Sequence, residues 1–106
     1  MDRSTNFNLL ADEIEKWVID KGFKSERSKL WELLVLAHSQ ISEAVDAYKK
    51  GKDEEVIGEE LVDAIIRIIH IMKIFGLDID YLYNSRMDYN WTRPSRFNTV
   101  RTSEKE

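Results

Sequence analysis

The sequence contains no cysteine, a single proline and only four glycines among its 106 residues. The absence of cysteine excludes a disulfide scaffold and a thiolate metal site, and it is compatible with a reducing, cytoplasmic location. Hydrophobic residues make up 42% of the chain and charged residues 34%, a balance that argues against disorder. These features together predict one all-α globular domain.

The chain also lacks an excess of positive charge and a long apolar run. Its net charge is −4, so we expect no nucleic-acid polymer as a partner. Residues 64–75 are the most apolar stretch, but Arg67, His70 and Lys73 interrupt it. Because this stretch is also too short to span a bilayer, we expect no membrane contact.

Apolar residues recur at helical spacing in four segments. We expect helices over residues 6–21, 28–50, 53–75 and 78–91. Gly22 can end the first helix with Phe23 folding back onto it, and Pro94 stops the fourth. One domain is therefore expected over residues 1–98, followed by a polar, flexible tail over residues 99–106.

Polar residues that can cap helices precede the first and fourth segments. Ser4, Thr5 or Asn6 can cap the first helix, and Asp78 or Asp80 can cap the fourth. Each would accept a hydrogen bond from a backbone N–H group of the first helical turn.

The second segment carries two neighbouring stripes at helical spacing. The stronger stripe consists of Leu30, Leu34, Ala37, Ile41, Ala44, Val45 and Tyr48. The stripe beside it consists of Leu33, Leu36, Gln40, Glu43 and Ala47. Gln40 therefore lies inside an apolar border.

The third segment is apolar nearly all round, and such a helix is normally buried. One broad face can pack on the other helices of the chain, while Val62, Ile66 and Ile69 need a separate cover. A polar stripe separates these faces and consists of Glu59, Glu60, Asp63, Arg67 and His70. Charges on a buried helix are costly unless they are paired or bind a metal ion.

Two polar pairs at i,i+3 spacing lie on the second and third segments. They are Gln40 with Glu43, and Glu60 with Asp63. Each pair lies on one helix face, and antiparallel packing of the helices would direct both pairs to a common volume. Carboxylates that share such a volume need cations, and oxygen ligands suit Mg²⁺ or Mn²⁺. The alternative is a pair of solvated acidic faces.

The fourth segment carries Arg86, Asn90 and Arg93 at i, i+4 and i+7, so they project to one side of the helix. Two guanidinium groups and an amide on one side can clamp phosphate oxygens. The same pattern is also common on helix surfaces that bind nothing.

These motifs resemble those of the MazG-like, all-α nucleoside triphosphate pyrophosphohydrolases. The family pattern Glu-x-x-Glu, spacer, Glu-x-x-Asp is similar to Gln40-x-x-Glu43, the 16 residues 44–59, and Glu60-x-x-Asp63. Residues 21–23, Lys-Gly-Phe, and residues 89–94, Tyr-Asn-Trp-Thr-Arg-Pro, also look like family motifs. The resemblance covers residues 6–98. Its one serious departure is the neutral Gln40 in place of the first glutamate.

The resemblance implies a four-helix MazG-like bundle that is completed by oligomerisation, as a homodimer or a dimer of dimers. It also implies Mg²⁺-dependent cleavage of a nucleoside or deoxynucleoside triphosphate to the monophosphate and pyrophosphate, with Mn²⁺ as a possible substitute. The implied metal ligands are Gln40, Glu43, Glu60 and Asp63. One of Glu43, Glu60, Asp63 or Glu59 would accept the proton of the attacking water. The implied substrate-binding residues are Arg86, Asn90, Arg93 and His38.

The residues leave some roles open. Arg67 can orient Asp63 or form an ordinary i,i+4 ion pair with it. His38 can contact a base or be a buried structural histidine. Tryptophans that can stack on a base or pack in a core or interface are Trp17, Trp31 and Trp91.

The neutral Gln40 leaves two functional alternatives. With one negative charge fewer than the family pattern, the enzyme could have reduced activity. The chain could instead be a non-catalytic nucleotide- or metal-binding relative with a regulatory or structural role. A di-iron bundle is disfavoured because it needs Glu-x-x-His on two helices, and neither of the two histidines follows a glutamate at that spacing.

Overall fold

The computed structural model describes residues 3–94, which form four α-helices, one short 3₁₀ turn and no strand. The elements are α1 (Phe7–Lys21), η1 (Arg27–Lys29), α2 (Leu30–Lys49), α3 (Glu54–Ile74) and α4 (Ile79–Thr92). The all-α prediction is confirmed, and the helix ends agree with the expected ones within about two residues. No helix in this part of the chain is long and apolar enough to cross a membrane. The expected domain limit at residue 98 and the tail over residues 99–106 lie outside the described residues.

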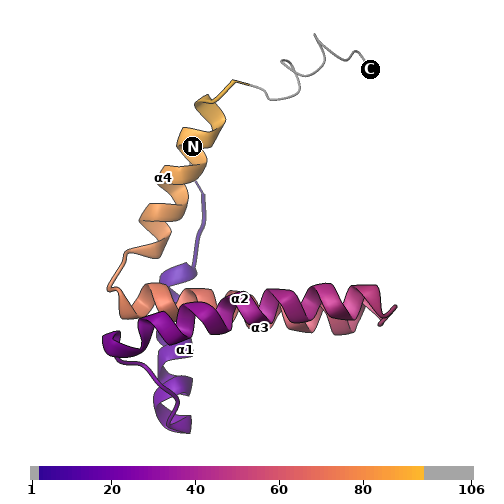
Figure 1. Cartoon of the computed structure of the whole chain (residues 1–106). Helices are drawn as coiled ribbons and strands as arrows, with labels where there is room; N and C mark the ends of the chain where they lie inside the picture. Colours follow the sequence, from indigo (N-terminus) through magenta and orange to yellow (C-terminus); the bar gives the residue numbers. More distant parts are fainter. Residues whose placement is uncertain (1–2, 95–106) are drawn as a thin grey trace.

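α2 and α3 lie side by side as a long antiparallel hairpin (Figure 1). Gly51, at φ 73°, forms the turn between them and allows the Lys52 N–H to donate to the Ala47 carbonyl at 3.0 Å. α1 crosses the hairpin steeply and packs mainly on α3, whereas α4 projects away from the hairpin (Figure 1). α1 therefore flanks the half of the hairpin that lies away from its turn, near the end of α3 (Figure 1).

The seam between α2 and α3 is built from small residues. The side chains that α2 buries are Leu33, Ala37, Gln40, Ala44 and Ala47, at the alternating spacing of four and three that is typical of a coiled-coil seam. Ala64 is the buried small residue that α3 contributes beside them. Alanine allows the two helix axes to approach closely, and Gln40 lies at the middle of this row.

α2 leaves four large residues of its stronger apolar stripe exposed, although Ala37 and Ala44 of the same stripe are buried. Leu34, Ile41, Val45 and Tyr48 are 48%, 45%, 50% and 75% exposed. These four residues therefore lie on the outer side of the hairpin. The physical reason is that α2 contacts only α3 and η1 extensively, so only one side of it is covered.

α3 is likewise less buried than its composition predicts. Leu61, Val62, Ile65 and Ile68 are between 39% and 52% exposed, because only α2 packs along this half of the helix. Ile69, which was expected to need a separate cover, is buried against Ala11 of α1. The core consists of two small clusters, one at the meeting point of α1, α3 and α4 and the other at the start of the hairpin.

The start of α1 and the start of α4 cap each other. The Asp80 carboxylate accepts hydrogen bonds from the Phe7 and Asn8 backbone N–H groups at 2.7 and 3.4 Å. In return, the Asn8 side-chain oxygen accepts from the Ile79 N–H at 2.9 Å. Asp78 caps α4, as expected, by accepting from its third residue at 3.1 Å. The cap of α1 therefore comes from another helix.

Asn6, which occupies the N-cap position of α1, makes no side-chain capping hydrogen bond. The expectation that Ser4, Thr5 or Asn6 caps α1 is therefore wrong, because the Asp80 carboxylate accepts from the free N–H groups of its first turn. This exchange fixes the place of α4 relative to α1, together with the contact between the Phe7 and Tyr83 rings at 4.9 Å.

Asp80→Ala should lower the free energy of unfolding by about 1–2 kcal/mol, the usual cost of losing a helix cap, because two N–H groups lose a charged acceptor. Chemical denaturation followed by circular dichroism measures this change. Glu13→Ala, an exposed acid of α1, is the matched control and should be nearly neutral. Equal losses for the two variants would contradict the capping role of Asp80.

Candidate functional site

The candidate site is centred on Gln40, a buried amide in the seam between α2 and α3, whose side chain is 7% exposed. Its nitrogen, Nε2, donates to Glu60 Oε1 at 2.5 Å and to Glu43 Oε1 at 3.3 Å. Its oxygen, Oε1, accepts from Arg67 Nε at 3.4 Å. We refer to Gln40, Glu43, Glu60 and Arg67 as the amide cluster.

The amide cluster follows from the helical spacing and the antiparallel hairpin. Gln40 and Glu43 share one face of α2, and Glu60 and Arg67, seven residues apart, share one face of α3. The donor side of the amide faces the two carboxylates and its acceptor side faces the guanidinium. Only this orientation of the amide gives each group a complementary partner.

Two carboxylate oxygens, from Glu43 and Glu60, converge on one point, the amide nitrogen. The remaining acids are placed differently. Asp63 and Glu59 are exposed, and they border a shallow depression on α3 together with Glu55. Among residues 3–94, no group of three or more His, Cys, Asp or Glu side chains is arranged to hold a metal ion. The hydrogen bond of Arg67 goes to Gln40, across the seam, instead of to Asp63 on the same helix.

A cavity of about 520 Å³ opens beside the amide cluster, between α1 and the hairpin. Its polar lining residues are Lys24, Gln40, Asp63, Arg67 and His70. Its apolar lining residues include Trp17, Phe23, Leu33, Leu36 and Ile66. A pocket with an aromatic wall and a few convergent polar groups is the usual form of a small-molecule site.

The aromatic wall depends on the turn after α1. Gly22 ends the helix at φ 73°, and the Phe23 N–H then bonds back to the Val18 carbonyl at 3.0 Å. This confirms the expected fold-back of Phe23, whose ring lies 5.1 Å from that of Trp17. Sequence reasoning missed the next residue, Lys24, as a cavity residue. Its only signal was its position directly after the glycine turn.

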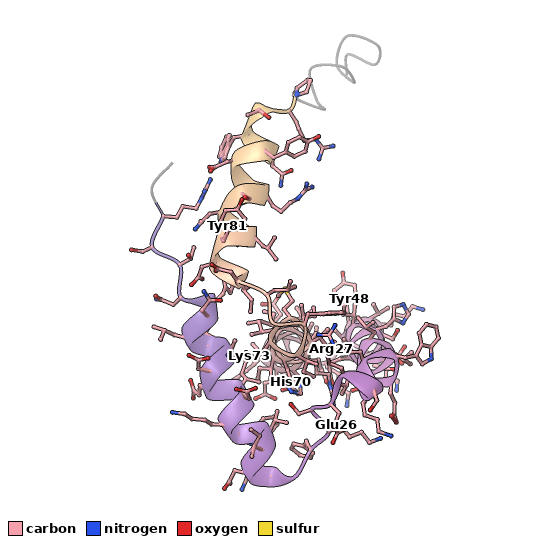
Figure 2. All side chains as sticks on the ribbon, turned by 90° about the vertical axis from the view of Figure 1, so that its left-hand side faces the viewer. Glu26, Arg27, Tyr48, His70, Lys73 and Tyr81 are labelled. Atoms are coloured by element: carbon pink, nitrogen blue, oxygen red, sulfur yellow. The ribbon has the colours of Figure 1, made fainter. Side chains whose placement is uncertain are left out.

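The segment that joins α1 to α2 is held against α3. Ser25 Oγ lies 3.1 Å from His70 Nε2, and Arg27 donates to the Ile74 carbonyl at 3.2 Å. In Figure 2, His70 lies on the same side of the hairpin as Glu26 of this segment. His70 is buried, and burial lowers its pKa, while the nearby Glu15 carboxylate offsets part of that effect. The neutral ring is therefore the form that the fold favours.

The expected phosphate clamp lies apart from the amide cluster. Arg86 and Asn90 are exposed on α4, and Arg93 is the exposed residue that directly follows the helix. α4 projects away from the centre of the hairpin (Figure 1). The Arg86 and Arg93 guanidinium groups lie 5.0 and 5.8 Å from the centre of the Tyr89 ring. Within one chain, the structure does not bring these three residues to the acids of the hairpin.

The structure also places His38 and the three tryptophans. His38 is exposed on α2, so the alternative of a buried structural histidine is wrong. Trp31 and Trp91 are 82% and 68% exposed and do not pack in the core of the chain. Trp17 alone among the tryptophans lines the cavity.

Comparison of the chain with protein-family models, with curated proteins and with solved structures finds no match. The resemblance to MazG-like enzymes therefore depends on the motifs quoted above, and the functional argument depends on the geometry of the site.

The free energy of unfolding should fall as the pH drops from about 7 toward 5. The unfolded histidine titrates near 6.5 while burial lowers the pKa of His70 in the folded chain, so the unfolded state binds more protons in this window. Denaturant titrations at several pH values measure the slope. His70→Gln should reduce it, and His38→Gln, at the other histidine, should not. An equal dependence of the free energy of unfolding on pH in His70→Gln and in the wild type would contradict this assignment.

Proposed function

We propose that this chain is a Mg²⁺-dependent nucleoside triphosphate pyrophosphohydrolase of the MazG-like class, which converts a nucleoside or deoxynucleoside triphosphate to the monophosphate and pyrophosphate. The convergence of Glu43 and Glu60 on one point beside the 520 Å³ cavity is the observation that carries the proposal. Carboxylate oxygens there suit a hard cation, and the aromatic wall of the cavity suits a nucleobase. The motif resemblance supports the same assignment.

Each group has a role in this proposal. Bound Mg²⁺ or Mn²⁺ would neutralise the triphosphate and activate water. Glu43 and Glu60 would hold the cation, with Asp63 at the cavity wall as a further ligand. Glu59 or Asp63, both exposed, would accept the proton of the attacking water. Trp17, half-exposed in the cavity wall, would stack on the base.

The partner in this proposal is a second copy of the chain, in a homodimer or a dimer of dimers. Two hairpins that cover each other's exposed stripes would form the four-helix MazG-like bundle that the resemblance implies. The stripes consist of Leu34, Ile41, Val45 and Tyr48 on α2, and Leu61, Val62, Ile65 and Ile68 on α3. Because α4 projects from its own hairpin, its Arg86, Asn90 and Arg93 would bind phosphate only at the site of another copy.

A second candidate function is a non-catalytic nucleotide- or metal-binding protein with a regulatory or structural role. The observation that favours it is the hydrogen bonding of Gln40. Its amide joins Glu43 to Glu60 and donates a hydrogen bond to each, so the amide itself stabilises the two carboxylates. In this case the cavity would bind a nucleotide without hydrolysis.

Pyrophosphate release from a panel of nucleoside and deoxynucleoside triphosphates, with Mg²⁺ or with a chelator, tests the proposal. We expect Mg²⁺-dependent release. Glu60→Gln should reduce kcat about a hundredfold because it removes a charged ligand of the cation. This loss corresponds to about 2.7 kcal/mol of transition-state stabilisation, at about 1.4 kcal/mol for each factor of ten. Glu54→Gln, at an exposed acid in the first turn of α3, is the matched control. Nucleotide binding by calorimetry without release would favour the second candidate.

Mg²⁺ should also raise the melting temperature, because a ligand that binds only the folded chain adds about 2.7 kcal/mol at a hundredfold excess over its Kd. Asp63→Asn should reduce the rise. Identical melting curves with Mg²⁺ and with chelator would contradict a metal site.

Light scattering at micromolar concentration should give at least a dimer. Ile65→Lys should shift the mass toward the monomer, because a charge would be buried where the two hairpins meet. Ile19→Lys, at an equally apolar residue that is 67% exposed on α1, is the control and should keep the oligomer. A monomeric wild-type chain would reject the proposed assembly.

A further inference from the structure

Arg67 is a charged residue in the wall of the cavity whose hydrogen bond is made to a neutral group. Its side chain is partly buried on α3, and its Nε donates to the carbonyl oxygen of Gln40 at 3.4 Å. A guanidinium group carries five N–H donors and is suited to phosphate oxygens. An arginine in a cavity wall is therefore able to bind an anion, and here the Gln40 carbonyl oxygen accepts from one of its N–H groups.

The Gln40 amide cannot keep its present orientation when a cation lies between Glu43 and Glu60. In this orientation the NH₂ group occupies the point on which the two carboxylates converge. A cation at that point needs oxygen ligands and repels the amide hydrogens. Rotation of the amide by about 180° brings its carbonyl oxygen to the cation, since amide torsions have a roughly two-fold preference.

The same rotation removes the partner of Arg67. The NH₂ group would then face the guanidinium, and both are hydrogen-bond donors. A buried donor without an acceptor is costly, so Arg67 must find another acceptor. The cavity that Arg67 already lines is the volume in which a phosphate oxygen could supply it.

We propose that Gln40 is a two-position switch that holds Arg67 until a divalent cation binds between Glu43 and Glu60, and then releases Arg67 to bind an oligophosphate in the cavity. This inference depends on the metal site of the proposed function and adds an order of binding, cation before phosphate. Gln40, the residue that departs from the family pattern, couples the two ligands. Because such coupling is reciprocal, the phosphate ligand also strengthens cation binding.

The sequence offers a direct probe, because Gln40 is its only glutamine. Protein labelled with ¹⁵N in the glutamine side chain gives a single NH₂ signal pair by NMR. Without metal, both protons are bonded to carboxylates, so we expect downfield shifts and slow hydrogen exchange. Saturation with Mg²⁺ should abolish both properties. Glu54→Ala, which removes an exposed acid in the first turn of α3 outside the amide cluster, should leave this response intact.

The second measurement follows Arg67. Its Nε–H signal is identified by its loss in Arg67→Lys, and it should shift with tripolyphosphate only when Mg²⁺ is present. Calorimetry should show that Arg67→Ala binds Mg²⁺–tripolyphosphate about tenfold more weakly than the wild type, as expected for loss of a charge-assisted hydrogen bond.

Three results would overturn the switch: an unchanged Gln40 signal pair while calorimetry shows Mg²⁺ binding, no Mg²⁺ binding at all, or equal tripolyphosphate affinity in Arg67→Ala and the wild type. The pyrophosphate assay on the same preparation separates this inference from the proposed function. Activity with an unresponsive Gln40 rejects the switch alone. A responsive Gln40 and Arg67 without activity reject the enzyme and keep the switch.

Discussion

The burial of one amide, Gln40, is the constraint on which the hairpin depends. A buried amide must find partners for its oxygen and its nitrogen, and Gln40 finds all of them in Glu43, Glu60 and Arg67. A shift of α3 by one helical turn would separate the amide from Glu60 and Arg67 together. A single polar residue in an apolar seam is known to fix the register of packed helices at some cost in stability. Gln40 therefore determines which residues of α2 and α3 lie opposite each other.

The register of the hairpin then places the cavity. α1 packs on the half of α3 that follows Arg67, where Ile69 meets Ala11. This position brings Trp17 and the turn at Gly22 alongside the amide cluster. The Ser25–His70 contact holds the segment that joins α1 to α2 against α3. The cavity thus has a charged end, which the hairpin supplies, and an aromatic wall, which α1 supplies. Its position beside the carboxylates is a consequence of how the three helices pack.

The sequence predicts what is local. The helices, the Gly22 turn and the Asp78 cap follow from spacing and residue type within a few positions, and so does the facing of Gln40 toward Glu60 once an antiparallel hairpin is assumed. The capping of α1 by Asp80 could not be predicted, because the contact joins residues more than 70 positions apart. The partner of Arg67 could not be predicted either. Asp63, one turn away, and Gln40, on another helix, are both within reach of its long side chain, and only the packed seam decides between them.

The inner face of α2 takes residues from both of its stripes and leaves the larger apolar residues outside. Burial of apolar area favours packing of the stripe with Leu34, Ile41 and Val45. The inner face of α2 instead consists of Leu33, Gln40 and three alanines, and two of these alanines, Ala37 and Ala44, belong to that same stripe. Packing of the stronger stripe on α3 would remove Gln40 from Glu60 and Arg67 and leave charged groups of α3 without partners. The polar contacts therefore determine the inner face, and the apolar area remains outside. A second hairpin that covers this area would satisfy both preferences at once, so the exposed stripe and the buried amide are two consequences of the same register.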